Sequence, residues 1–79
     1  MNLRILLFAG LAETCGSTFL EVELPDVCSV AELQTVLAQT QPKLKKATYR
    51  VAVNSVYVED DFQLAMNAEI ALIPPVSGG

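Results

Sequence analysis

The residues best suited to chemistry lie at the end of the chain, in a tail of six residues: Pro74, Pro75, Val76, Ser77, Gly78 and Gly79. Each proline fixes φ at about −65° and lacks an amide donor, so regular secondary structure should end at Ile73. The two glycines have no Cβ, which leaves the backbone beside the terminal carboxylate free of side-chain bulk. This combination predicts a tail that enters a narrow pocket of another protein. The alternative is an ordinary frayed terminus.

The carboxylate of Gly79 is the reactive group that such a tail would deliver. A terminal carboxylate is ionised and unreactive at neutral pH. It becomes an acyl donor once it is joined to a phosphate as a mixed anhydride, and ATP in a partner enzyme could supply that phosphate. Gly79 would allow a close approach to the phosphate, and Gly78 would let the backbone lie flat in a channel.

The side chains offer little chemistry of their own. The chain has no histidine and two cysteines, Cys15 and Cys28, which are too few for a structural zinc site or an iron–sulfur cluster. We expect reduced thiols, no bound metal and no bound cofactor. The sequence has no nucleophile paired with a base and no glycine-rich phosphate loop. We therefore expect that this chain is not an enzyme on its own.

Length and composition indicate one globular domain, because 52% of the 79 residues are apolar and 18% are charged. The net charge of −4 makes nucleic acid an unfavourable partner and a basic protein surface a plausible one. Arg4 and the apolar residues 5–9 resemble the start of a signal peptide, but Glu13 interrupts the pattern. No segment approaches the roughly 18 apolar residues that span a bilayer. We expect a cytoplasmic protein with no membrane partner.

The apolar pattern predicts five strands, at residues 3–9, 18–24, 49–54, 56–58 and 70–73. The first is almost continuously aliphatic, which is typical of a central strand buried on both faces. The second alternates between apolar and charged residues, which is typical of a half-exposed strand. Phe19 stands among the charges of that strand, and we assign it no function.

One main helix is predicted to begin after Ser29 and to run to about Gln41, where Pro42 stops it. Ser29 and Glu32 form a capping box, in which each side chain satisfies a free backbone amide at the helix start. The apolar stripe of this helix consists of Val30, Leu33, Val36 and Leu37. The residues between Gly10 and Gly16 leave room for one further helical turn.

Two charged runs have ordinary explanations. Lys43, Lys45 and Lys46 follow the main helix, where they complement the negative end of its dipole; a phosphate site is the alternative. Residues 59–61 are three carboxylates in a row, but hard-cation loops supply more oxygens at wider spacing. We interpret this second run as an acidic turn.

The order strand, strand, helix, strand, short strand, strand predicts an α+β fold with one mixed sheet and the helix packed across one face. The first and last strands are the most hydrophobic, so we place them side by side and parallel in the middle. This is the β-grasp, or ubiquitin-like, arrangement. The predicted domain covers residues 1–73, and residues 74–79 form a flexible tail.

The sequence resembles the small subunits of molybdopterin synthase, which are ubiquitin-like sulfur carriers. The tail carries the most telling part of the likeness, since Pro-Pro-Val-Ser precedes a diglycine that is by itself widely shared. Ala52-Val53-Asn54, about twenty-five residues before the end, also fits the family, as do Leu7-Phe8-Ala9, Glu13 and Gly16. The likeness spans the whole chain.

This resemblance implies a role in molybdenum cofactor biosynthesis. In that family an E1-like activating enzyme uses ATP to adenylate the terminal glycine, here Gly79, and sulfur transfer then gives a thiocarboxylate. The tail, here Pro74 to Gly79, enters the large subunit, where the sulfur builds the dithiolene of molybdopterin from a pterin precursor. Two small and two large subunits form the complex, which is a transferase.

The family also docks both partners through a hydrophobic patch on the sheet. Phe8 matches that pattern directly, while Tyr57 and Ile73 are different but still large apolar residues at the other patch positions. Ordinary strand packing is the alternative explanation for all three. Two other functions also remain open at this point. One is a sulfur carrier for thiamine synthesis or tRNA thiolation, and the other is a ubiquitin-like interaction module without terminal chemistry.

Overall fold

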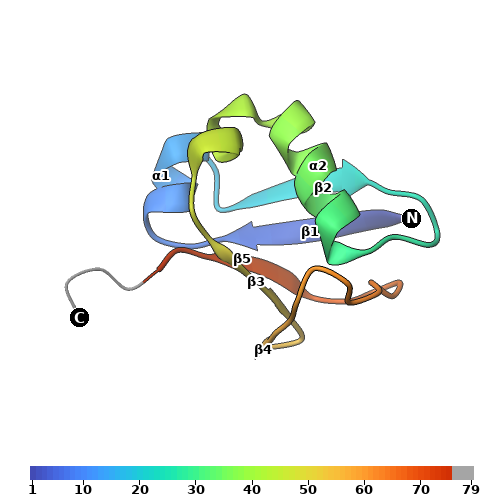
Figure 1. Cartoon of the computed structure of the whole chain (residues 1–79). Coiled ribbons are helices and arrows are strands. Elements are labelled where there is room, and N and C mark those ends of the chain that lie inside the picture. Colours follow the sequence, from blue (N-terminus) through green and yellow to red (C-terminus); the bar gives the residue numbers. More distant parts are fainter. Residues whose placement is uncertain (76–79) are drawn as a thin grey trace.

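The computed structural model describes residues 1–75, which fold into one five-stranded sheet crossed by one main helix (Figure 1). The elements in chain order are β1 (Asn2–Leu7), α1 (Gly10–Cys15), β2 (Phe19–Glu23), α2 (Val30–Thr40), the 3₁₀ helix η1 (Pro42–Lys46), β3 (Arg50–Val53), β4 (Val56–Tyr57) and β5 (Ile70–Ile73). The predicted α+β class and β-grasp order are confirmed. Each strand except β5 is shorter than predicted.

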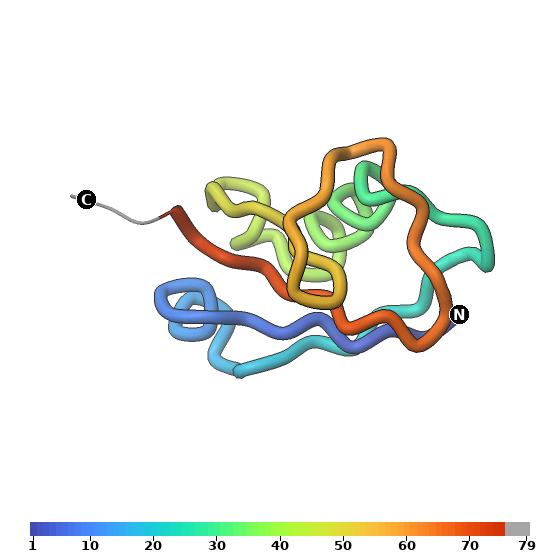
Figure 2. The backbone as a smooth tube through the Cα atoms, turned by 90° about the horizontal axis from the view of Figure 1, so that it is seen from below, coloured from blue at the N-terminus to red at the C-terminus, as the bar shows by residue number. Residues whose placement is uncertain are grey.

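The sheet has the strand order β2-β1-β5-β3-β4. β1 and β5 are parallel, and the three other neighbouring pairs are antiparallel. Seen from below in Figure 2, β1 and β5 run side by side through the middle of the molecule. The two most hydrophobic strands are therefore central neighbours, as predicted.

The capping box at the start of α2 is present. The Ser29 hydroxyl accepts a hydrogen bond from the Glu32 amide at 3.2 Å, and the Glu32 carboxylate accepts one from the Ser29 amide at 3.1 Å. Backbone carbonyls of Phe62 and Asp60 accept the next two amides, those of Val30 and Ala31, at 3.0 Å each. The acidic turn at residues 59–61 thus helps to fix the helix start.

The core lies between α2 and one face of the sheet. From the helix, Val30, Leu33 and Leu37 are at most 1% exposed. Opposite them, Ile5, Ile70 and Leu72 are fully buried, because alternate residues of β1 and β5 point to this face. Close packing of this kind supplies most of the stability of a small domain.

The prediction that the first strand is buried on both faces is wrong. Leu3, Ile5 and Leu7 are buried, whereas Arg4 is exposed and Leu6 is half-buried. The reason is that α2 covers one face only, and within residues 1–75 no helix lies on the other (Figure 1). Part of this continuous aliphatic run therefore lies on an uncovered face of the sheet.

Two turns use left-handed backbone conformations. Asn54 and Ser55 join β3 to β4 with φ of 51° and 71°, which is the pattern of a two-residue hairpin loop. Asn67, with φ of 64°, lies in the turn before β5. Asn54 also ties the two turns together, because its side-chain oxygen accepts a hydrogen bond from the Glu69 amide at 3.0 Å.

The end of β5 fixes where the tail begins. β5 stops at Ile73, directly before Pro74 and Pro75, which belong to no helix or strand. Figure 1 shows that this strand leads toward the same end of the molecule as α1. Among residues 1–75, no helix has both the length and the apolar character needed to cross a membrane.

Candidate functional site

The sheet face opposite α2, called the open face below, carries one row of side chains drawn from all five strands. The register orders this row across the sheet as Phe19, Leu6, Ala71, Ala52 and Tyr57. Two alanines stand near its middle and an aromatic ring stands at each end. Because the central side chains are short, the open face is low in the middle and raised at its edges.

A hollow of about 240 Å³ occupies this low region. Its apolar lining consists of Leu6, Phe8, Ala52, Tyr57, Ala71 and Ile73, and Ser55 and Glu69 add polar atoms. An apolar hollow with a few polar groups at its margin suits the insertion of a side chain from another protein.

The structure brings the three predicted docking residues together at this hollow. Phe8 and Tyr57 are 48% and 47% exposed, and Ile73 is half-buried. Exposed aromatic rings are energetically unfavourable in an isolated domain but are common at the centres of protein interfaces. Their shared position makes docking geometrically possible, and their role in docking stays a prediction.

A second hollow, of about 350 Å³, continues this surface toward the tail. It is lined by Phe8, Ala9, Ile73, Pro74 and Pro75. Phe8 and Ile73 line both hollows. The apolar surface therefore extends without interruption from the middle of the sheet to the first residues of the tail.

Ala9 shapes the wall of this second hollow through an unusual backbone conformation. Its φ of 50° and ψ of −128° lie in a region that L-residues avoid and glycine adopts easily. The Ala9 carbonyl accepts hydrogen bonds from the amides of Ala12 and Glu13 at 3.1 and 3.4 Å. This sharp reversal lies between Phe8 and α1, which begins at Gly10.

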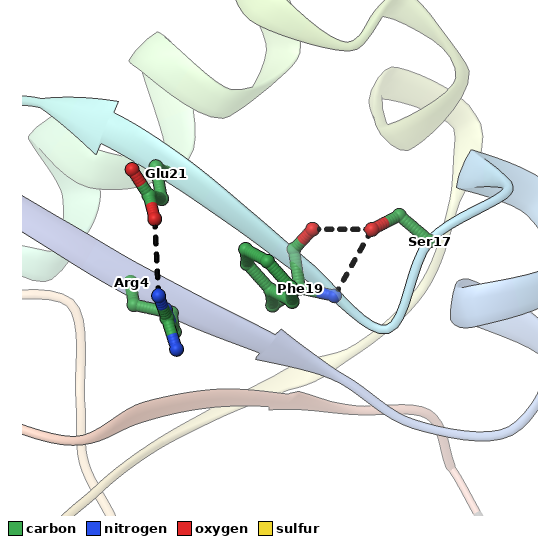
Figure 3. Close-up of polar contacts among 4 residues, drawn as sticks. All are labelled: Arg4, Ser17, Phe19 and Glu21. Carbon is green, nitrogen blue, oxygen red and sulfur yellow. Dashed lines mark hydrogen bonds and ion pairs between the residues drawn. The ribbon is translucent and has the colours of Figure 1, made fainter.

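Two arginines stack on the aromatic rings at the ends of the row. The guanidinium carbon of Arg50 lies 3.9 Å from the centre of the Tyr57 ring, and that of Arg4 lies 4.5 Å from the centre of the Phe19 ring. Figure 3 shows that Arg4 also bonds to Glu21, at 3.1 Å. In the same view, the Ser17 hydroxyl donates to the Phe19 carbonyl at 2.7 Å and accepts from the Phe19 amide at 3.3 Å, which fixes the strand start.

The ionisable side chains of residues 1–75 form no catalytic cluster. No group of three acidic, cysteine or histidine residues in that part of the chain could hold a metal ion. Cys15 and Cys28 are free thiols. Burial raises the pKa of the Cys28 thiol, the nearby Glu32 carboxylate raises it further, and the N-terminal ammonium opposes both. Burial also raises the pKa of Tyr49.

Part of the predicted site falls outside the described residues. Val76, Ser77, Gly78 and Gly79 lie there, so their predicted entry into a partner channel and the terminal chemistry at Gly79 stay predictions. Pro74 and Pro75 are described, and both contact the second hollow.

Sequence reasoning missed several residues of the open face. It gave no role to Arg50, Ala52 or Ala71, and it dismissed Phe19 as an isolated surface aromatic. Only the strand register aligns these residues with Phe8 and Tyr57, since they come from three separate strands. The sequence does contain one relevant signal, an Arg–Val–Ala–Val strand followed by a short strand that ends in tyrosine. This pattern shows which residues of the two strands are paired only once the length of the turn between them is known.

Comparison with known proteins gives full-length matches. The model of the ThiS family matches residues 5–79. The molybdopterin synthase sulfur carrier subunit of Dictyostelium discoideum is 36% identical, over 96% of this chain and 94% of its own length. Among solved structures, SAMP1 from Haloferax volcanii has a TM-score of 0.88 at 28% identity, with both chains fully covered. A chain in the complex of subunits 1 and 2 of the molybdopterin-converting factor from Helicobacter pylori has a TM-score of 0.73 at 22% identity and full coverage of both chains, which supports the shared fold.

Proposed function

Because this chain belongs to the ThiS family, we propose that it is a sulfur carrier and the small subunit of a molybdopterin synthase. The observation that carries the proposal is the continuity of the apolar open face with the start of the tail, through Phe8 and Ile73. A sulfur carrier needs a surface that binds its partner next to the start of the tail that ends in the reactive diglycine. The relative from Dictyostelium discoideum, which bears the name sulfur carrier subunit, supports the same function.

The proposed chemistry takes place at Gly79. A carboxylate oxygen attacks the α-phosphorus of ATP in an E1-like partner and displaces pyrophosphate, which gives an acyl adenylate. A sulfide equivalent then attacks the carbonyl carbon and displaces AMP, which gives a thiocarboxylate. The sulfur is passed to the pterin precursor, and hydrolysis returns the Gly79 carboxylate. ATP belongs to the activating partner, and this chain needs no cofactor of its own.

The proposed division of labour places most catalytic side chains in the large subunit. This chain brings the reactive carbonyl, and its folded body presents the tail. The complex contains two small and two large subunits and works in the cytoplasm. The Helicobacter pylori complex of subunits 1 and 2 is consistent with a two-protein assembly built on this fold.

A second candidate is a sulfur carrier that serves thiamine synthesis or tRNA thiolation. The match to the ThiS family is compatible with it, because the family name does not specify molybdopterin synthase. The reaction at Gly79 would be the same, and only the partner differs. Pull-down with the full chain separates the two, because recovery of the synthase large subunit supports the first candidate and recovery of a thiazole synthase or tRNA thiolation enzyme supports the second.

Intact-mass spectrometry tests the terminal chemistry. The full chain is incubated with its activating enzyme, ATP and a sulfide source, and it should gain the mass difference between sulfur and oxygen. The matched control is a chain with one alanine added after Gly79, which should fold equally well but keep its mass, because the reactive carbon is displaced. An unchanged mass of the natural chain would contradict the proposal. So would equal conversion of the extended chain, which would remove the terminal position of Gly79 from the mechanism.

A further inference from the structure

Arg50 stands on the open face at the point where the tail leaves the sheet. It is the first residue of β3, and the register pairs it with Ile73, the last residue of β5. Its guanidinium carbon lies 3.9 Å from the centre of the Tyr57 ring, and Tyr57 lines the hollow of about 240 Å³. A fixed positive charge therefore borders both the hollow and the start of the tail.

The charge of Arg50 has no partner among the described residues. Within residues 1–75 the ion pairs are those of the N-terminal ammonium with Asp26 and of Arg4 with Glu21. Arg4 is the useful comparison, because it also lies on the open face and also stacks on an aromatic ring. Its charge is met by a carboxylate 3.1 Å away in the same chain, as Figure 3 shows, whereas that of Arg50 is not.

The stacking explains how an unpaired arginine is tolerated beside an apolar surface. A guanidinium is planar and weakly hydrated, and the face of an aromatic ring attracts it. Its position is restrained before any partner arrives, so little side-chain entropy is lost when a carboxylate binds it. Arg50 is thus prepared for an ion pair that the described part of the chain does not provide.

Charged groups of opposite sign border the hollow at different places. Arg50 borders it through Tyr57 and Ile73, while the exposed side chain of Glu69 contributes to its lining. The chain as a whole carries a net charge of −4, so this cation stands out against an acidic background. A complementary partner surface would carry a carboxylate near Arg50 and no acidic group near Glu69.

We propose that Arg50 binds an aspartate or glutamate of the synthase large subunit while an apolar side chain of that subunit fills the hollow. The proposal rests on the proposed function, which supplies the large subunit as the partner. Apolar contacts alone allow several orientations of one surface on another, and a single ion pair beside the tail removes most of them. Arg50 is therefore a specificity-determining residue that aligns the tail with the partner channel.

Titration calorimetry and association kinetics with the large subunit of the same organism test this assignment. The two variants are Arg50→Gln and Arg4→Gln in the full chain, which remove the same charge from the same face. We expect Arg50→Gln to weaken binding roughly tenfold and to reduce the salt dependence of the association rate. Arg4→Gln should change affinity less than about twofold, because its charge is already paired within the chain. Equal effects of the two variants, or no effect of Arg50→Gln, would overturn the proposal.

A charge-swap experiment separates a direct contact from a structural effect. Arg50→Glu should bind still more weakly than Arg50→Gln, and a lysine in place of one acidic residue of the large subunit should restore the lost affinity. Thermal unfolding of each variant confirms that the fold is retained. Failure of every such lysine to restore binding would overturn the proposed ion pair. Failure of the natural chain to bind the large subunit at all would instead contradict the proposed function, and the assignment of Arg50 would fall with it.

Discussion

The two faces of the sheet are built from the same five strands but differ in how much of their apolar side chains is exposed. On the face under α2, Ile5 and Leu72 are fully buried. On the open face, the neighbouring positions hold a half-buried Leu6 and an exposed Phe8. Because successive side chains of a strand point to opposite faces, one run of residues supplies both surfaces. The covered face supplies stability, and the open face keeps apolar area available for another protein.

Truncation of the covered face should give the largest effect on stability. Ile5 is 0% exposed and pairs with Leu20 on one side and Ile70 on the other. Ile5→Ala should lower the free energy of unfolding by about 2–5 kcal/mol, because it removes buried methyl groups and leaves a cavity in the core. Urea unfolding followed by circular dichroism measures the loss. A change below about 1 kcal/mol would mean that the covered face is more adaptable than the packing indicates.

Truncation of the open face should separate binding from stability. Phe8→Ala should weaken binding to the large subunit by about 2 kcal/mol, which is typical of an aromatic interface anchor. It should change the free energy of unfolding by less than about 1 kcal/mol, because about half of the ring is already exposed. Phe62→Ala is the matched control, since Phe62 is 42% exposed but lies outside both hollows. If the control lost as much affinity as Phe8→Ala, the open face would not be the docking surface.

Ala9 lies between the end of β1 and the start of α1, and its backbone conformation predicts an unusual stabilising substitution. Ala9→Gly should raise the free energy of unfolding by about 1 kcal/mol, because the released strain exceeds the entropy that glycine adds to the unfolded chain. Gly16→Ala offers the opposite test at the other end of α1, where φ is 70°. That substitution should destabilise by a similar amount. Urea midpoints measured side by side check both signs, and a destabilised Ala9→Gly would show that the reversal at Ala9 is not strained.

Local signals in the sequence predicted the parts of the fold that depend on neighbouring residues. The capping box of Ser29 and Glu32 identified the start of α2 because its partners are three residues apart. The two prolines identified the end of β5 in the same way. Burial of the first strand was predicted wrongly, because an aliphatic run does not tell whether one face or two will be covered.

The candidate site was predicted only in part. Phe8, Tyr57 and Ile73 were recognised through a family resemblance, and the structure places all three at one hollow. Arg50 was missed because its significance depends on two long-range facts. These are its register opposite Ile73 and the absence of an ion-pair partner within residues 1–75. Neither fact can be read from a strand pattern alone.

The last predicted effect concerns the buried Cys28 thiol and appears only at alkaline pH. Burial raises the pKa of Cys28 above its ordinary value of 9.0. Below that value the folded and unfolded states both keep the proton, so stability does not depend on this group. As the pH rises past it, the unfolded chain loses the proton first, and stability falls by at most about 1.4 kcal/mol per pH unit until the folded thiol ionises too. Urea unfolding under reducing conditions at about pH 8 and about pH 10 should reveal this loss, and Cys28→Ala should reduce its slope. An equal slope in both proteins would assign the alkaline loss to other groups, of which Tyr49 is the first candidate because burial also raises its pKa.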